Sequence, residues 1–166
     1  MKKSLILLSL SGILNTSFAQ PHAEHLRVEN RIAPVGIDAP SPRFSWELTS
    51  PDKNVVQSAY EIQVSRNASF RNADLQWSSG KVNSDINLRI PYAGKALAPG
   101  QALLWRVRVW DGQGKPSAWS MPAGFRMGMM SAANWKARWI GAGFTEDKSE
   151  RPAAYFRKEF TAKKKI

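Results

Sequence analysis

The chain has 166 residues, of which 43% are hydrophobic and none is Cys. This composition is too apolar for a disordered chain, and without Cys neither a disulfide framework nor the lipid-modified Cys of a lipoprotein can form. The formal net charge of +11 does not indicate nucleic-acid binding. Lys2, Lys3 and residues 163–165 stand at the two ends of the chain, and the other basic residues are scattered without a basic helix or an aromatic ribonucleoprotein motif.

Residues 1–19 have the pattern of an export signal. Two lysines precede an apolar run at residues 5–14, and Ser17 and Ala19 are small residues at the positions that signal peptidase recognises. A membrane-spanning helix needs about 20 apolar residues, so this run is too short to be an anchor. We therefore expect cleavage after Ala19 and an exported protein, in the periplasm or outside the cell, with no membrane span after cleavage.

Residues 20–25 are expected to form a flexible N-terminal tail ahead of the folded part. The tail contains His22, Glu24 and His25, which are residue types that bind metals. A structural zinc site needs four ligands, and no further candidate lies nearby in the sequence. We predict no metal site there.

Residues 26–48 form an extended lead-in that runs into a strand. Pro34, Pro40 and Pro42 prevent a helix. Beyond Arg43, apolar and polar residues alternate, which is typical of a strand with one buried face. The lead-in resembles the N-terminal segment of bacterial α-L-rhamnosidases, both in its amino-acid sequence and in its position just after an export signal.

The hydrophobic period remains two as far as Met127, with turn clusters between the alternating segments. No segment has a helical period, so the pattern predicts an all-β antiparallel sandwich. The apolar positions of the expected strands are Phe44, Trp46 and Leu48; Tyr60, Ile62 and Val64; Leu75 and Trp77; Ile86, Leu88 and Ile90; Trp105, Val107 and Val109; and Phe125 and Met127.

Three segments resemble a fibronectin type III-like, or immunoglobulin-like, module. Residues 103–114, LLWRVRVWDGQG, resemble its long penultimate strand and the turn that follows. Residues 116–120, PSAWS, and 124–128, GFRMG, resemble the approach to the last strand and the strand itself. The alternation predicts the fold class, whereas the name of the module comes from this resemblance. The module is expected to cover residues 26–128.

Tryptophan is abundant, and indole rings can stack on sugars. Trp46 and Trp105 share a face with aliphatic neighbours and are expected in the core, and Trp77 in the core or covering an edge. Trp110 and Trp119 differ, because the alternation puts Trp110 on the solvent side. The same alternation puts Arg106 and Arg108 there. We favour cation–π stacking between arginine and tryptophan, with ligand binding as the alternative.

No carboxylate pair predicts an active site. Glycoside hydrolysis needs two carboxyl groups facing each other across a cleft, about 5 to 9.5 Å apart. Glu47, Glu61 and Asp85 fall on surface positions of a sandwich, with no evident cleft. Asp111-Gly112-Gln113-Gly114 resembles part of a calcium loop but is first a hairpin turn. We therefore assign no catalytic residue, no cofactor-binding residue and no cofactor.

The pattern changes after Gly128. Residues 129–134 are expected to be a linker. In residues 135–166, Trp139-Ile140-Gly141 and residues 156–160, FRKEF, resemble the first two strands of the next β-sandwich domain in α-L-rhamnosidases. Together with the lead-in, these segments make the chain resemble the N-terminal part of a bacterial α-L-rhamnosidase of glycoside hydrolase family 78.

The resemblance implies a parent enzyme that hydrolyses terminal α-L-rhamnose from glycosides with inversion. Its acid and base are carboxylates of a helical barrel, and no residue here matches them. The chain is thus expected to be an N-terminal fragment with a non-catalytic module. Its partners are the later β domains and the barrel, and rhamnose-containing glycosides through the parent. A carbohydrate- or surface-binding sandwich without activity, and a structural spacer, stay open as alternatives.

Overall fold

The computed structural model describes residues 20–141, 143, 145, 149, 153 and 155–161. The expected export signal, residues 1–19, therefore lies outside the described residues. Contacts divide the chain into two units, Met1–Asn134 and Trp135–Ile166. Among the described residues no helix is long and apolar enough to cross a membrane.

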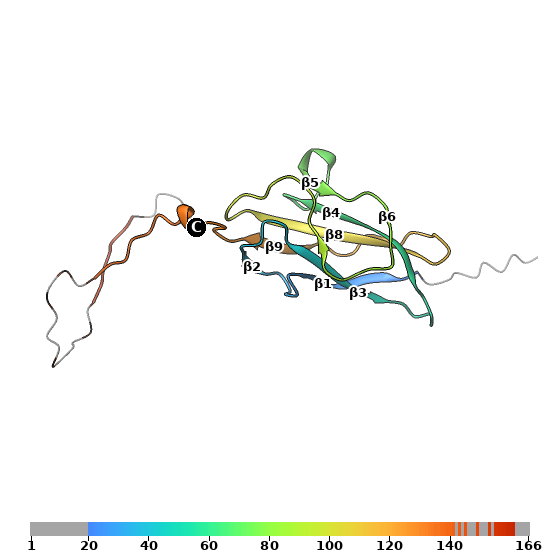
Figure 1. Cartoon of the computed structure of the whole chain (residues 1–166), viewed down its shortest axis with the longest axis horizontal. Helices are drawn as coiled ribbons and strands as arrows, with labels where there is room; N and C mark the ends of the chain where they lie inside the picture. Colours follow the sequence, from blue (N-terminus) through green and yellow to red (C-terminus); the bar gives the residue numbers. More distant parts are fainter. Residues whose placement is uncertain are drawn as a thin grey trace, which may run out of the picture. The chain divides into compact units, whose positions relative to one another are not determined.

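The first unit is a sandwich of two sheets (Figure 1). The smaller sheet has the strand order β1-β3-β7, and the larger has the order β2-β9-β8-β4-β5, with β6 also paired to β4. All strand pairs are antiparallel except β2 and β9. The strands are β1 (His22–Val28), β2 (Val35–Ile37), β3 (Arg43–Thr49), β4 (Gln57–Ser65), β5 (Leu75–Ser78), β6 (Val82–Asn83), β7 (Ile90–Pro91), β8 (Ala102–Asp111) and β9 (Ala123–Met127). The predicted all-β sandwich is confirmed, and its helical content in the described residues is two short 3-10 turns, Asn72–Asp74 and Ala132–Asn134.

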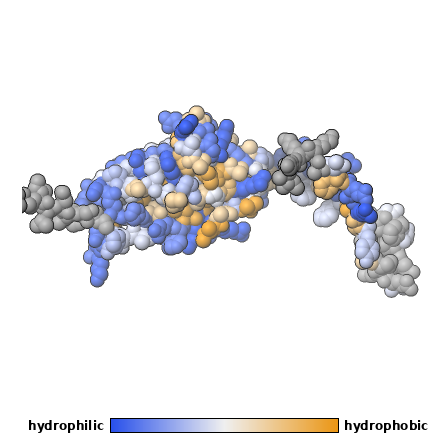
Figure 2. Space-filling model, turned by 180° about the vertical axis from the view of Figure 1, so that it is seen from behind, coloured by the Kyte–Doolittle hydropathy of each residue, from blue (hydrophilic) through white to orange (hydrophobic). Residues whose placement is uncertain are grey.

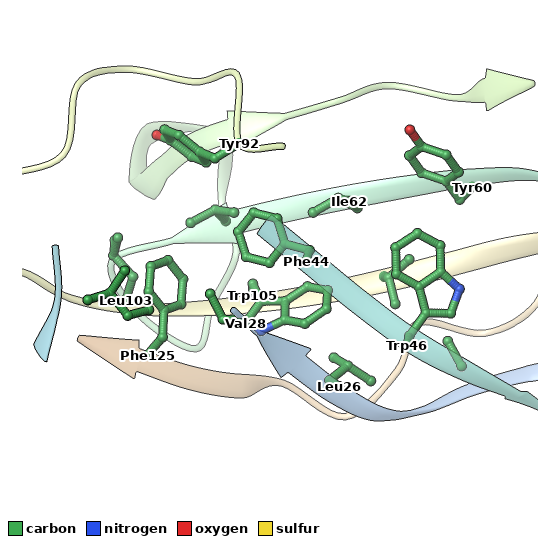
Figure 3. Close-up of a cluster of buried hydrophobic side chains, with 14 of the residues drawn as sticks. Leu26, Val28, Phe44, Trp46, Tyr60, Ile62, Tyr92, Leu103, Trp105 and Phe125 are labelled. Carbon is green, nitrogen blue, oxygen red and sulfur yellow. The ribbon is translucent and has the colours of Figure 1, made fainter. Parts of the chain in front are cut away.

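The core lies between the two sheets, where the alternating apolar side chains of β3, β4 and β8 point toward one another (Figure 3). Trp46 and Trp105 are buried, as predicted, and Trp77 packs against the core while half-buried. The Trp46 ring meets the Tyr60 ring edge-on at 5.3 Å between centroids, and the Phe44 and Trp105 rings lie 4.6 Å apart. These contacts join the two sheets through aromatic pairs.

The chain enters the fold earlier than the sequence suggests. Residues 20–25 are expected to be a tail, yet His22 is already the first residue of β1 and pairs with Thr49 of β3. Ala23 is buried. Near His25, which has a φ of 49°, the register shifts between Glu24 and Arg27. This bulge interrupts the alternation that would have revealed the strand.

The strand expected at residues 86–90 is wrong for most of its length. Ile86 and Leu88 are 56% and 61% exposed, and only Ile90 enters a strand, β7. Where a ladder was expected, one backbone hydrogen bond, from the Trp46 N–H to the Asn87 carbonyl at 3.1 Å, and two contacts made by side chains hold this segment. The Asn87 amide donates to the Trp46 carbonyl, and the Arg89 N–H donates to the Ser45 hydroxyl. Sequence alternation alone could not reveal these contacts.

In the second unit, the described residues of 135–161 form no strand. Its large apolar side chains are exposed; they are Trp135, Trp139, Ile140, Tyr155, Phe156 and Phe160. The two strand-like segments expected there thus have no ladder in the part of this unit that the structure describes.

Candidate functional site: a cation–π ladder on the larger sheet

A ladder of aromatic rings and cations covers the outer face of the larger sheet. Each arginine stacks between two aromatic rings. Arg106 lies 4.3 Å from the centroid of the Phe70 ring and 4.4 Å from that of Trp119, and Arg108 lies 4.7 Å from that of Trp119 and 5.0 Å from that of Trp110. Lys81 lies over the other end of the series, 4.9 Å from the centroid of the Trp110 ring. We call these six residues the cation–π ladder. The expected stacking of Arg106 and Arg108 on Trp119 is confirmed.

The ladder forms because β8 places every second side chain on this face. Arg106, Arg108 and Trp110 point outward, while Trp105, Val107 and Val109 fill the core. Neighbouring strand β4 pairs in register, so that Gln63 lies opposite Arg106 and Glu61 opposite Arg108. The sheet therefore sets the spacing of the two guanidinium groups.

Trp119 reaches the ladder from a segment that has no strand assignment but is tied to β8. The Ser117 N–H donates to the Val109 carbonyl at 2.7 Å, and the Val109 N–H donates to the Ser117 hydroxyl at 3.1 Å. Ser120 and Val107 repeat the arrangement at 2.8 and 3.1 Å. Two serines, each using its N–H and its hydroxyl, thus fix the backbone on both sides of Trp119.

Both guanidinium groups are held in place by β4. Arg106 donates two hydrogen bonds to Gln63 Oε1, at 3.0 and 2.7 Å. Arg108 contacts Glu61 Oε2 through Nε at 2.9 Å and through Nη2 at 2.7 Å. Burial lowers the pKa of Arg106, and the neighbouring charge of Arg108 adds to this. Arg106 nevertheless remains charged, because an arginine loses its proton only at very high pH.

This geometry favours structural stacking over sugar binding. A sugar needs a free indole face, and two guanidinium groups already lie over the Trp119 ring. Trp110 is not the solvent-exposed ring that the alternation suggests, because it is only 7% exposed under Arg108 and Lys81. The ladder covers this face with three cations, and the two guanidinium groups among them already have partners in β4.

We expect Trp119→Ala to lower the free energy of unfolding by about 1 to 2 kcal/mol, from partial burial and lost cation–π contact. Replacing both Arg106 and Arg108 by Gln should remove much of what Trp119 contributes, since the two changes act on one contact. Denaturant melts of the wild type, the Trp variant, the double Arg variant and the triple variant measure this coupling. Full additivity would mean that the stacking contributes nothing.

The carboxylates considered in the sequence do not converge. Glu47 lies on β3 in the smaller sheet, where it contacts His25 at 2.9 Å and Arg27 at 2.9 Å. Glu61 lies on β4 in the larger sheet and is occupied by Arg108. Asp85 is exposed in the segment before β7. The structure therefore gives no reason to assign an acid–base pair to these residues.

His25 and the Asp-Gly turn have other partners. His25 Nδ1 faces Glu47, and His22 lies on the same strand. Asp111 accepts the N–H groups of Gln113 and Lys115 at 2.9 and 2.8 Å, which makes a side-chain-closed turn after β8. Within the described residues, no group of three or more His, Cys, Asp or Glu is placed to hold a metal ion.

Sequence analysis missed the two ends of the ladder and its supporting amide. Phe70 lies in a turn with a φ of 49° and is nevertheless buried, and Lys81 lies between β5 and β6. Neither belongs to an alternating run, so no periodic signal marks them. Gln63 could have been found, because it occupies an outward position of a strand that was predicted.

Two facing sheets in this strand order form a β-sandwich of the immunoglobulin-like class. The model of the Rha78A-like N-terminal immunoglobulin domain matches residues 23–131. The chain belongs to this family.

The following two similar proteins are both named α-L-rhamnosidase. An α-L-rhamnosidase of Streptomyces avermitilis is 43% identical over 109 residues, which cover 66% of this chain and 11% of the relative. One from Alteromonas sp. strain LOR is 34% identical over 175 residues, covering 93% of this chain and 19% of the relative. The chain thus spans less than a fifth of the length of these relatives.

Solved structures agree with this likeness. The structure of Streptomyces avermitilis α-L-rhamnosidase complexed with L-rhamnose matches with a TM-score of 0.71 and 40% identity, over 74% of this chain and 12% of that one. The α-L-rhamnosidase from Dictyoglumus thermophilum matches with a TM-score of 0.67 and 37% identity, over 72% and 14%.

Proposed function

We propose that this chain is the non-catalytic N-terminal part of an exported α-L-rhamnosidase, in which the sandwich packs against and positions the domains that follow. The observation that carries the proposal is the extent of the similarity. The Alteromonas relative matches 93% of this chain with only 19% of its own length. Such coverage must continue past residue 131, so the likeness includes the second unit as well as the module.

In this proposal the parent enzyme hydrolyses terminal α-L-rhamnose from glycosides with inversion. One carboxylic acid protonates the leaving oxygen, and a second carboxylate activates a water on the opposite face of the sugar. Both groups belong to parts of the parent beyond this chain. The engaged positions of Glu47 and Glu61 on different sheets support this assignment.

The proposal also divides the chain. Residues 1–19 direct export and are cleaved after Ala19, which the lysines and the apolar run of that segment support. Residues 26–128, together with the first residues of β1, form the module, in keeping with the family match over 23–131. Residues 129–134 connect it to residues 135–166, which begin the next β-sandwich domain.

Purified residues 20–166 are expected to show no turnover of an aryl α-L-rhamnoside above the buffer rate, since no pair of carboxyl groups faces a shared cleft. Release of the chromophore measures this, with a complete α-L-rhamnosidase as the positive control. Turnover that disappears in a Glu47→Gln or Glu61→Gln variant would refute the assignment.

The same sample tests the alternative of a carbohydrate-binding module. Titration with L-rhamnose, followed by calorimetry, should give no saturable heat, because two guanidinium groups already stack on the indole of Trp119. Saturable binding that is lost in Trp119→Ala would favour the carbohydrate-binding function.

A further inference from the structure

The backbone is held from two sides where the chain leaves the last strand of the sandwich. The Gly128 N–H donates to the Ile37 carbonyl at the end of β2, with 2.7 Å between nitrogen and oxygen. The Gly128 carbonyl accepts the Gly100 N–H at 3.0 Å. Gly128 is therefore bonded both to the edge strand and to the turn before β8.

The carboxylate of Asp38 binds the backbone just after Gly128. Asp38 Oδ1 accepts the N–H of Met130 at 3.3 Å. The same oxygen lies 2.3 Å from the place where a Cβ on Gly128 would be, and the carbonyl carbon of Gly36 lies 3.2 Å from that place. Asp38 can reach Met130 in this way only because residue 128 has no side chain.

The residues that follow are folded rather than extended. Met130 has a φ of 60°, and its side chain packs against the core. The Ser131 N–H donates to the Met129 carbonyl at 2.7 Å, and the Asn134 N–H donates to the Ser131 carbonyl at 3.0 Å. The Asn134 amide also donates to the Met129 carbonyl. The segment expected to be a linker, 129–134, is thus a compact turn within the first unit.

We propose that Asp38, Gly128 and Met130 form a latch that fixes the direction in which the chain leaves the sandwich. Asp38 follows β2 and Gly128 follows β9, and these two strands form the one parallel pair of the described sheets. A free linker of Gly and Ser would leave the next part of the chain unoriented, whereas a bonded turn carries the orientation of the sandwich to residue 134. The inference rests on the proposed function, since a positioning module needs a rigid exit.

Hydrogen exchange of the Met130 amide, measured by NMR on residues 20–166 under native conditions, tests the latch. Asp38→Ala should speed this exchange about tenfold, which corresponds to the loss of one hydrogen bond to a carboxylate. Asp38→Asn keeps an acceptor oxygen and should change the rate by less than about threefold. Asp52→Ala, which removes an exposed carboxylate from the β3–β4 loop, is the matched control and should leave it unchanged.

The exchange of the Val107 amide in the core serves as the internal reference for global opening. An unchanged Met130 rate in Asp38→Ala would overturn the latch. So would a Val107 rate that rises by the same factor, since the change would then act on the whole fold.

A second variant pair tests the steric part of the latch. Gly128→Ala should also speed exchange at Met130 about tenfold, because the new Cβ displaces the Asp38 carboxylate. In the Asp38→Ala background, adding Gly128→Ala should raise the rate by less than about threefold, since both changes break one contact. If the two factors multiply in full, the two residues act separately and the latch is refuted. The test uses no rhamnoside, so its failure is distinct from failure of the proposed function.

Discussion

Replacing Trp46 by Ala is expected to lower the free energy of unfolding of the sandwich by about 3 to 5 kcal/mol. Trp46 is 1% exposed and lies between the sheets, with its ring against Tyr60 (Figure 3). Truncation removes a large apolar side chain and leaves a cavity that close-packed neighbours cannot fill. A loss of this size is a large part of the total stability of a domain, which is about 5 to 15 kcal/mol.

Denaturant melts of Trp46→Ala and Trp119→Ala make the comparison. The two residues have the same side chain, but Trp46 lies between the sheets and Trp119 lies on the outer face of the larger sheet. Each is therefore a control for the other. Equal losses for the two variants would show that Trp119 is buried as deeply as Trp46.

Figure 2 shows apolar and polar residues mixed on the surface, so an exposed apolar residue does not by itself mark a core position.

Replacing Gln57 by Leu is expected to cost about 3 kcal/mol, although it makes the interior more apolar. Gln57 is buried, and its Oε1 accepts the indole N–H of Trp46 at 3.1 Å. Its Nε2 donates to the carbonyls of Ser84 and Ile86 at 3.0 and 3.1 Å. Leucine leaves one donor and two acceptors without this partner, and each such buried group costs about 1 to 3 kcal/mol.

Thermal and denaturant melts of Gln57→Leu measure this cost. Gln113→Leu, in the exposed turn after β8, is the matched control and should change stability by no more than about 0.5 kcal/mol. Combining Gln57→Leu with Trp46→Phe should cost less than the sum of the single changes, because the unpaired indole N–H is then gone. A stabilised Gln57→Leu variant would contradict the role assigned to this amide.

The alternation of apolar and polar residues predicted the strands that have one face in the core and the other toward solvent. β3, β4 and β8 have a clear period of two, and the structure places them where the pattern does. The pattern failed at residues 86–90, because side-chain hydrogen bonds hold that segment: the Gln57 amide donates to the Ile86 carbonyl, and the Asn87 amide donates to the Trp46 carbonyl. Such contacts join residues 29 and 41 positions apart and leave no local periodic signal.

The candidate site was predicted in its centre and missed at its ends. Arg106 and Arg108 follow from the period of β8, and Trp119 from the stacking that two outward guanidinium groups allow. Phe70 and Lys81 come from turns, whose positions relative to β8 depend on the whole fold. The burial of Trp110 has the same origin, because its cover includes Lys81 from outside the strand.

The two serines beside Trp119 have a consequence for the behaviour of the protein at high concentration. An unpaired strand edge can recruit a strand from another molecule and start aggregation. β9 pairs with β8 only at residues 102–105, which would leave the remaining edge of this long strand open. Ser117 and Ser120 occupy the N–H and carbonyl groups of Val109 and Val107 instead. The five residues PSAWS, which begin with Pro116, thereby protect the edge of this ten-residue strand at Val107 and Val109 against self-association.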